Sequence, residues 1–154
     1  MTDLRLKSVD RLEVTVLVDN YTDVLALQGS DVVQRAMIPP SAMPLLAEHG
    51  LSCLLSMSSG PEQYQVLLDT GMSPICLFHN AEKLGIDLSA IDTLVLSHGH
   101  FDHFGGLHEF LDRARGEIDL VMHPSAFLQR RIAIPPDIHA DMPWLDPESI
   151  KGPK

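Results

Sequence analysis

The chain has 154 residues and a formal net charge of −10, and 45% of its residues are hydrophobic. Its 11 Lys and Arg residues are scattered, with Arg130-Arg131 as the only adjacent pair, which argues against the clustered basic face of a nucleic-acid-binding protein. No stretch reaches the ~18 consecutive apolar residues of a membrane span, and the polar amino terminus does not resemble a signal peptide. With only two cysteines, the composition indicates a cytoplasmic protein without a nucleic-acid or membrane partner.

The first half of the chain predicts strands separated by a long loop. Residues 12–18 alternate between apolar and polar side chains, as in a half-buried strand. Residues 27–44 are rich in turn-forming residues and predict a loop long enough to be a functional lid. Residues 51–57 and 64–69 predict a hairpin around a Ser-Ser-Gly-Pro turn, with Cys53 on its inward face.

The second half predicts alternating helices and strands. A Ser-Pro pair opens a helix over residues 73–85, with Gly85 at its end. Residues 93–96 form a short β-branched run typical of a buried strand. Apolar residues at helical spacing predict a helix over 107–114, which Gly116 ends. Residues 118–122 predict another strand, and Pro124 begins a short helix.

A cluster of metal-binding side chains follows the strand at 93–96. It consists of His98, His100, Asp102 and His103, all within six positions. Imidazole and carboxylate groups are the ligands that hold zinc, manganese or iron where thiolates are absent. His98 and His100 are two residues apart, so in extended backbone they point the same way and can bind one ion together. Asp102 and His103 are adjacent and point differently, which suits a second ion.

This cluster resembles the metal motif of the metallo-β-lactamase fold superfamily. A second match lies upstream, where residues 66–71 read Val-Leu-Leu-Asp-Thr-Gly and resemble that superfamily's strand and Asp-Thr-Gly turn. Residues 48–52 and 79–87 resemble the branch typified by dihydropterin ribofuranosylaminobenzene-phosphate synthase. The resemblance implies an α+β fold, the amino-terminal half of an αβ/βα sandwich with one mixed sheet and flanking helices. It covers residues 10–131, as a partial domain, and leaves residues 132–154 as an irregular Pro-rich acidic tail.

The resemblance also implies the roles of individual residues. His98 and His100 would bind a first ion, and Asp102 and His103 a second, with Zn²⁺, Mn²⁺ or Fe²⁺ as the metal. Asp102 would in addition be the catalytic proton acceptor. Asp69 would lie behind the ligands and orient the loop by hydrogen bonds.

The family pattern requires three further ligands, namely another His, a bridging Asp and a final His, and no second segment of that type is found. We therefore expect a hydrolase or transferase that is truncated and impaired alone, acting on a phosphorylated or pterin-like small molecule. The alternatives are a half-fold that binds metal without catalysis and an interaction module. An uncovered sheet face would then promote self-association or require a complementing chain.

Several polar residues outside the motif have two readings. Asn20, after the first strand, matches a family position near the cleft, but a turn-forming Asn explains it equally well. His123 follows a strand and either faces the cleft or caps the next helix. His49 and His79 are expected to be hydrogen-bonded structural residues.

Overall fold

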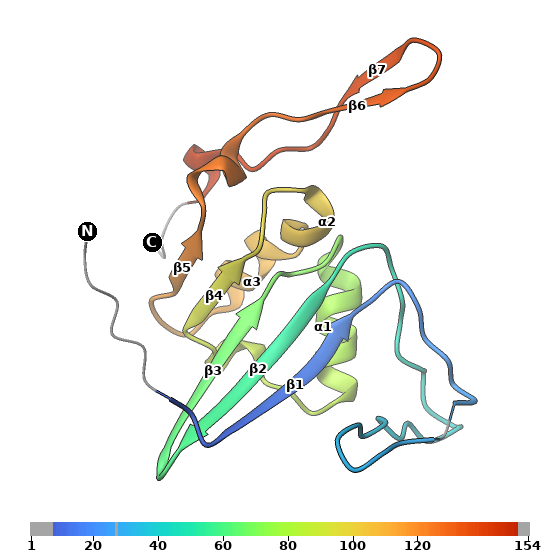
Figure 1. Cartoon of the computed structure of the whole chain (residues 1–154), viewed down its shortest axis with the longest axis vertical. Coiled ribbons are helices and arrows are strands. Elements are labelled where there is room, and N and C mark those ends of the chain that lie inside the picture. The colour runs from blue at the N-terminus through green and yellow to red at the C-terminus, as the bar shows by residue number, and fades with distance from the viewer. Residues whose placement is uncertain (1–7, 27, 151–154) are drawn as a thin grey trace.

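The computed structural model describes residues 8–26 and 28–150, and its main feature is one mixed sheet of five strands (Figure 1). The strands are arranged in the order β1-β2-β3-β4-β5. The first three pair antiparallel and the last three pair parallel. Their bounds are β1 (Arg11–Val18), β2 (Ser52–Ser59), β3 (Glu62–Leu68), β4 (Thr93–Leu96) and β5 (Asp119–Met122). Each coincides with a predicted strand, so the expected mixed sheet is confirmed.

Among the described residues, four short helices lie in the connections between the parallel strands, and two more follow β5. The first four are α1 (Pro74–Lys83), η1 (Leu88–Ala90), α2 (Phe101–Phe104) and α3 (Leu107–Arg113), and the last two are η2 (Pro124–Phe127) and η3 (Pro147–Ser149). The Ser73 hydroxyl caps α1 by accepting from the Cys76 amide at 3.3 Å, as the Ser-Pro pair predicts. The helix ends next to Gly85, which has a φ of +70°. The predicted helix over residues 107–114 is also present, since α3 ends at Arg113 with Ala114 as its C-cap, before Gly116.

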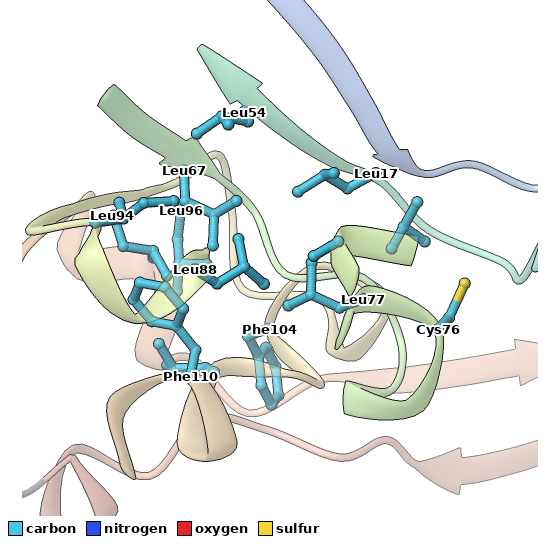
Figure 2. Packing of buried hydrophobic residues seen from close by; sticks show 14 of the residues in the cluster. Leu17, Leu54, Leu67, Cys76, Leu77, Leu88, Leu94, Leu96, Phe104 and Phe110 are labelled. Atoms are coloured by element: carbon cyan, nitrogen blue, oxygen red, sulfur yellow. The ribbon is translucent and has the colours of Figure 1, made fainter. Parts of the chain in front are cut away.

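The helices cover one face of the sheet and build the hydrophobic core there (Figure 2). Leucines from the strands meet apolar side chains from α1, α2 and α3, and burial of these side chains is the main stabilising force of the fold. The contributing residues include Leu17, Leu54, Leu67, Leu94 and Leu96 from the sheet, and Leu77, Phe104, Leu107 and Phe110 from the helices. The motif that follows β4 is thus attached to the best-packed part of the chain.

The other face of the sheet carries apolar side chains that no described element covers. On β1, Leu12 is 54% exposed, Val14 55% and Val16 51%. The register places these residues beside Met57, Leu55 and Cys53 of β2. Cys53 is buried, as predicted, although it lies on this face and Leu54 of the same strand packs in the core with the helices. Periodicity separates the two faces of a strand without saying which one the helices cover.

The expectation of an irregular tail after residue 131 is wrong for its first part. There, β6 (Arg131–Ile134) and β7 (Ile138–Asp141) form an antiparallel hairpin that projects from the sheet (Figure 1). The prolines at 135 and 136 lie in its turn, so they link the strands and do not interrupt them. Leu145 is fully buried in the core, so part of the tail packs on the domain. Residues 151–154 of the predicted tail lie outside the described residues.

The long connection between β1 and β2 contains no helix or strand among its described residues, as predicted. Leu27, the first residue of the predicted loop, and residues 1–7 lie outside the described residues. In the described part of the chain, no helix combines the length and apolarity needed to cross a membrane.

Candidate metal centre

The His-rich motif lies at the carboxyl ends of the two central parallel strands (Figure 1). β4 leads through Ser97 into the motif, and α2 then carries Asp102 and His103. The neighbouring strand β3 ends one residue before Asp69. Because the carboxyl ends of parallel strands meet at one edge of a sheet, Asp69 reaches residues about thirty positions later in the sequence.

Asp69 is fully buried and anchors the motif through both carboxylate oxygens. Its Oδ1 accepts a hydrogen bond from the Ser97 amide at 2.8 Å. Its Oδ2 lies 2.6 Å from Ser97 Oγ and 2.8 Å from His103 Nδ1. A carboxylate accepts hydrogen bonds and donates none, so the Ser97 hydroxyl and the His103 Nδ1 atom are both donors. In a neutral imidazole, this leaves the lone pair of His103 on Nε2.

Ser97 transmits the same constraint to His98. The Ser97 hydroxyl has one proton, which it donates to Asp69, so it must accept from His98 Nδ1 at 2.9 Å. His98 Nε2 then carries a lone pair, and His100 Nδ1, 3.0 Å away, donates to it. One buried carboxylate therefore sets the tautomers of two predicted ligands, directly for His103 and through a hydroxyl for His98.

The three imidazoles form a compact group. The ring centroids of His98 and His103 are 4.1 Å apart, and those of His98 and His100 are 4.6 Å apart. Burial, together with the neighbouring His103 and His100 rings, lowers the pKa of His98. The lowered pKa favours the neutral ring, which is the form that binds a metal ion.

Asp102 lies beside this group and is contacted from a second segment. Its carboxylate Oδ2 is 3.7 Å from His103 Nε2 and 3.3 Å from His49 Nε2. The His49 side chain is 71% exposed, so it lies at the open side of the site. Gly50 has a φ of +116°, and a Cβ atom built on it would meet the Asp102 carbonyl oxygen at 2.0 Å. The backbone therefore needs glycine here to bring His49 to Asp102.

Glu48 fixes the segment that carries His49. Its Oε1 accepts hydrogen bonds from the backbone amides of Met72 and Ser73 at 3.0 and 2.8 Å. Its Oε2 accepts from the Ser73 hydroxyl at 2.6 Å. These bonds join the segment before β2 to the turn that follows Asp69. The sequence analysis placed neither His49 nor Glu48 in the site, although both lie in the 48–52 segment that resembles the synthase branch.

The two residues with alternative readings are not joined to the cluster by any hydrogen bond among the described residues. The His123 ring caps η2, with Nδ1 2.7 Å from Ser125 Oγ and 3.2 Å from the Ser125 amide. The backbone N–H of Asn20 donates to the carboxylate of Asp19 at 2.7 Å. A shallow hollow lined by Tyr64, Thr93 and their neighbours lies at the opposite end of β3 and β4 and includes no motif residue.

The donor set fits a metal ion, but the side chains are not arranged as a closed site. Three imidazoles and one carboxylate are suitable ligands for zinc, manganese or iron. Among the described residues, however, no three His, Cys, Asp or Glu side chains converge on one point. His98 and His100 instead bond to each other at 3.0 Å. Binding of one ion by both residues would require this hydrogen bond to break.

Comparison with known proteins identifies the family. Residues 60–151 match the family model described as "Metallo-beta-lactamase superfamily", which is more than half of the chain. The chain belongs to the metallo-beta-lactamase superfamily. The matched region contains the Asp69 turn and the whole His-rich motif, so the predicted superfamily is confirmed.

Among curated proteins, the chain is similar to a 7,8-dihydropterin-6-methyl-4-(beta-D-ribofuranosyl)-aminobenzene-5'-phosphate synthase of Methanocaldococcus jannaschii. The two are 36% identical over 84 residues, which are 54% of this chain and 29% of that protein. An uncharacterized protein of the same organism is 32% identical over 84 residues, covering 54% of this chain and 31% of the relative. The matches thus span less than a third of the relatives' length. They agree with the resemblance to the synthase branch.

Solved structures of metallo-beta-lactamases are also similar to this chain. The Rm3 metallo-beta-lactamase has 31% identity and a TM-score of 0.38, covering 49% of this chain and 27% of the other. A metallo-beta-lactamase of Cronobacter sakazakii has 26% identity and a TM-score of 0.38, covering 48% and 28%.

Proposed function

We propose that this chain supplies the first ligands of a dinuclear metal centre in a hydrolase or transferase. His98 and His100 would hold one ion, and Asp102 and His103 the other. The observation that carries the proposal is the hydrogen-bond network of Asp69, because it places a lone pair on Nε2 of both His98 and His103, the one on His98 facing His100 Nδ1 at 3.0 Å. Metal ligands in proteins are typically oriented by hydrogen bonds from side chains behind them, as in this network.

A bound pair of Zn²⁺, Mn²⁺ or Fe²⁺ ions would supply Lewis acidity and an activated nucleophile. The chain's own residues would orient the ligands and accept protons. Asp102 is placed to accept a proton, since its carboxylate is largely buried yet faces His103 and the exposed ring of His49. Asp69 would keep the ligand tautomers fixed during turnover.

For the substrate we propose a small phosphorylated or pterin-like molecule. The support is the name of the synthase relative, which makes a phosphorylated aminobenzene compound attached to a dihydropterin. Both hydrolysis and group transfer are compatible with this ligand set. A cytoplasmic location is part of the same proposal and is supported by the free thiols of Cys53 and Cys76.

We further propose that the chain acts with a second polypeptide or a second copy of itself. Two ligands per ion are fewer than a catalytic site of this kind uses, and ligands from a partner chain would complete it. The uncovered apolar face of β1 and β2 supports this idea, because large exposed apolar patches normally mark interaction sites. The isolated chain should accordingly show little turnover.

Metal binding by variants of the whole chain tests the proposal. A double variant with His98→Ala and His100→Ala should lose most of the bound Zn²⁺ or Mn²⁺ measured by elemental analysis after dialysis. His108→Ala is a matched control, because His108 is exposed and the only hydrogen bond of its side chain among the described residues is to Ser149. Equal metal content in the double variant and the wild type would refute the assigned site.

Activity measurements separate the remaining alternatives. If the chain binds metal and a complementing polypeptide restores phosphodiesterase, thioesterase or transferase activity, the enzyme reading is supported. If it binds metal and no complementation restores activity, a non-catalytic metal-binding half-fold is favoured. If it binds no metal but associates with itself or another chain, it is an interaction module.

A further inference from the structure

Arg130 joins the motif loop to a segment that follows β5. Its Nη1 atom donates to the Gly99 and Leu128 carbonyls at 2.7 and 2.8 Å, with a longer contact of 3.3 Å to the Ala126 carbonyl. Its Nη2 atom donates to the Ser125 carbonyl at 3.0 Å. Among the described residues, Arg130 forms no ion pair. Its charge is therefore directed at backbone carbonyl oxygens.

The two segments are also in direct backbone contact. Gly99, the residue between His98 and His100, is buried. A Cβ atom built on it would lie 1.9 Å from the Ala126 carbonyl oxygen. Only glycine allows this approach, so the motif loop rests directly on the η2 turn that Arg130 holds.

We propose that Arg130 is a positioning residue for the His98–His100 ligand pair, an inference that rests on the proposed metal site. The Gly99 carbonyl belongs to the peptide that joins Gly99 to His100. Fixing this carbonyl fixes the peptide plane and hence the direction in which the His100 side chain leaves the backbone relative to His98.

The residue type suits this role. A guanidinium group presents several N–H donors in one rigid plane, so it can bond to both segments simultaneously, whereas a lysine ammonium is a point charge on a flexible stem. The bonds to Ser125, Ala126 and Leu128 are local, and they would also fit an anchor for the η2 turn alone. The bond to Gly99 joins residues 31 positions apart and is the one that reaches the motif loop. Metal affinity therefore distinguishes the two roles, because loss of a residue that anchors only the η2 turn would leave this affinity unchanged.

Three single variants of the whole chain test the proposal, with Co²⁺ as the probe and its visible absorption as the readout. Arg130→Ala should weaken Co²⁺ binding by about 10- to 100-fold, as loss of a group that orients metal ligands does. Arg130→Lys should lie between Arg130→Ala and the wild type. Arg131→Ala is the matched control, because Arg131 is exposed and pairs only with Asp141 in the described structure, and it should bind Co²⁺ like the wild type. Low-millimolar methylguanidinium should restore part of the affinity of Arg130→Ala.

A second measurement does not need the metal. Hydrogen exchange followed by mass spectrometry reports on residues 97–104, where the Ser97 amide bonds to Asp69 and the His103 amide to the His100 carbonyl. Exchange of this segment should accelerate about tenfold or more in metal-free Arg130→Ala and stay unchanged in Arg131→Ala.

The outcomes are distinct. A folded Arg130→Ala or Arg130→Lys variant with wild-type Co²⁺ affinity overturns the proposal, and so does a lost affinity that methylguanidinium leaves unchanged. If Arg130→Ala does not fold, Arg130→Lys alone decides by the same criterion. If the wild type itself binds no Co²⁺, the proposed function fails, and the exchange rates decide on Arg130: unchanged exchange in a folded variant then overturns its positioning role.

Discussion

Replacing Asp69 by asparagine should invert the tautomers of two ligands with a change of one atom. The asparagine oxygen must take the Oδ1 position, because the Ser97 amide there is a donor at 2.8 Å. Its NH₂ group then takes the Oδ2 position and donates toward Ser97 Oγ and His103 Nδ1, which both become acceptors. The Ser97 proton turns to His98 Nδ1, so both rings carry their protons on Nε2, where the metal should bind.

The size of the effect follows from the bonds that metal binding must break. In Asp69→Asn, returning the protons of His98 and His103 to Nδ1 breaks two hydrogen bonds of about 1–1.5 kcal/mol each. These are the bond from the new amide to His103 Nδ1 and the bond from the Ser97 hydroxyl to His98 Nδ1. The sum of about 2–3 kcal/mol corresponds to a 30- to 150-fold weaker metal affinity, at roughly tenfold for each 1.4 kcal/mol. The fold should survive, since the replacement has the same shape, and the free energy of unfolding should fall by about 1–2 kcal/mol because charge-assisted bonds become neutral ones.

Two controls make this prediction specific. Ser97→Ala removes only the relay, so it should free the His98 tautomer, leave His103 unchanged and weaken binding less than Asp69→Asn. Asp92→Asn changes an exposed carboxylate whose only hydrogen bond within the described residues is to the adjacent Thr93 side chain, and it should have no effect.

Co²⁺ titration measures the affinity, urea unfolding measures the stability, and long-range ¹H–¹⁵N spectra of the histidine rings show which nitrogen carries the proton. If His98 and His103 of Asp69→Asn keep their protons on Nδ1 and bind Co²⁺ as tightly as in the wild type, the tautomer argument is wrong.

Three further predictions concern other parts of the chain. Val14→Lys, on the uncovered sheet face, should reduce self-association in sedimentation velocity, and a wild type that stays monomeric over a wide concentration range would contradict this expectation. In urea unfolding, Gly50→Ala should lower the free energy of unfolding by about 1–3 kcal/mol more than Gly60→Ala does. Both glycines have positive φ, but only a Cβ atom on Gly50 would clash with the Asp102 backbone. Equal losses of free energy in the two variants would refute the close-approach argument. Burial raises the pKa of Cys76 from an ordinary value of 9.0 to about 11, so its thiol should react with Ellman's reagent at pH 8 far more slowly in the folded than in the urea-unfolded chain. Because the raised pKa favours the neutral thiol in the folded state, its contribution to stability is complete below pH 9 and should be lost as the pH rises from 9 to 11.

The strands and the ligand motif could be predicted because their signals are local. Alternation over residues 12–18 and the β-branched run over 93–96 each fit one kind of element. The motif itself lies within six positions, so its chemistry is visible without any knowledge of the fold. The superfamily followed from this motif and the Asp69 turn together.

Other features depend on contacts between distant residues and left no local signal. The contact of His49 with Asp102 spans 53 positions, and the bond from Arg130 to the Gly99 carbonyl spans 31. The hairpin after residue 130 was missed for a different reason: prolines usually argue against a strand, whereas here they occupy the turn between two strands of four residues each. In each case, the missing information was which segments lie side by side.

The dependence of the site on strand register follows from the same geometry. Asp69 reaches Ser97 because Leu68, which precedes it, pairs with Val95 in the parallel ladder between β3 and β4. Side chains alternate between the faces of a strand, so a slip of one residue would move Asp69 to the other side of the sheet edge and away from the motif. The histidines would then keep their spacing in the sequence but lose the carboxylate that fixes their tautomers. The His-rich motif therefore provides the ligands, while the register of two central strands, held by the core of Leu67 and Leu94 beneath it, makes them competent to bind a metal.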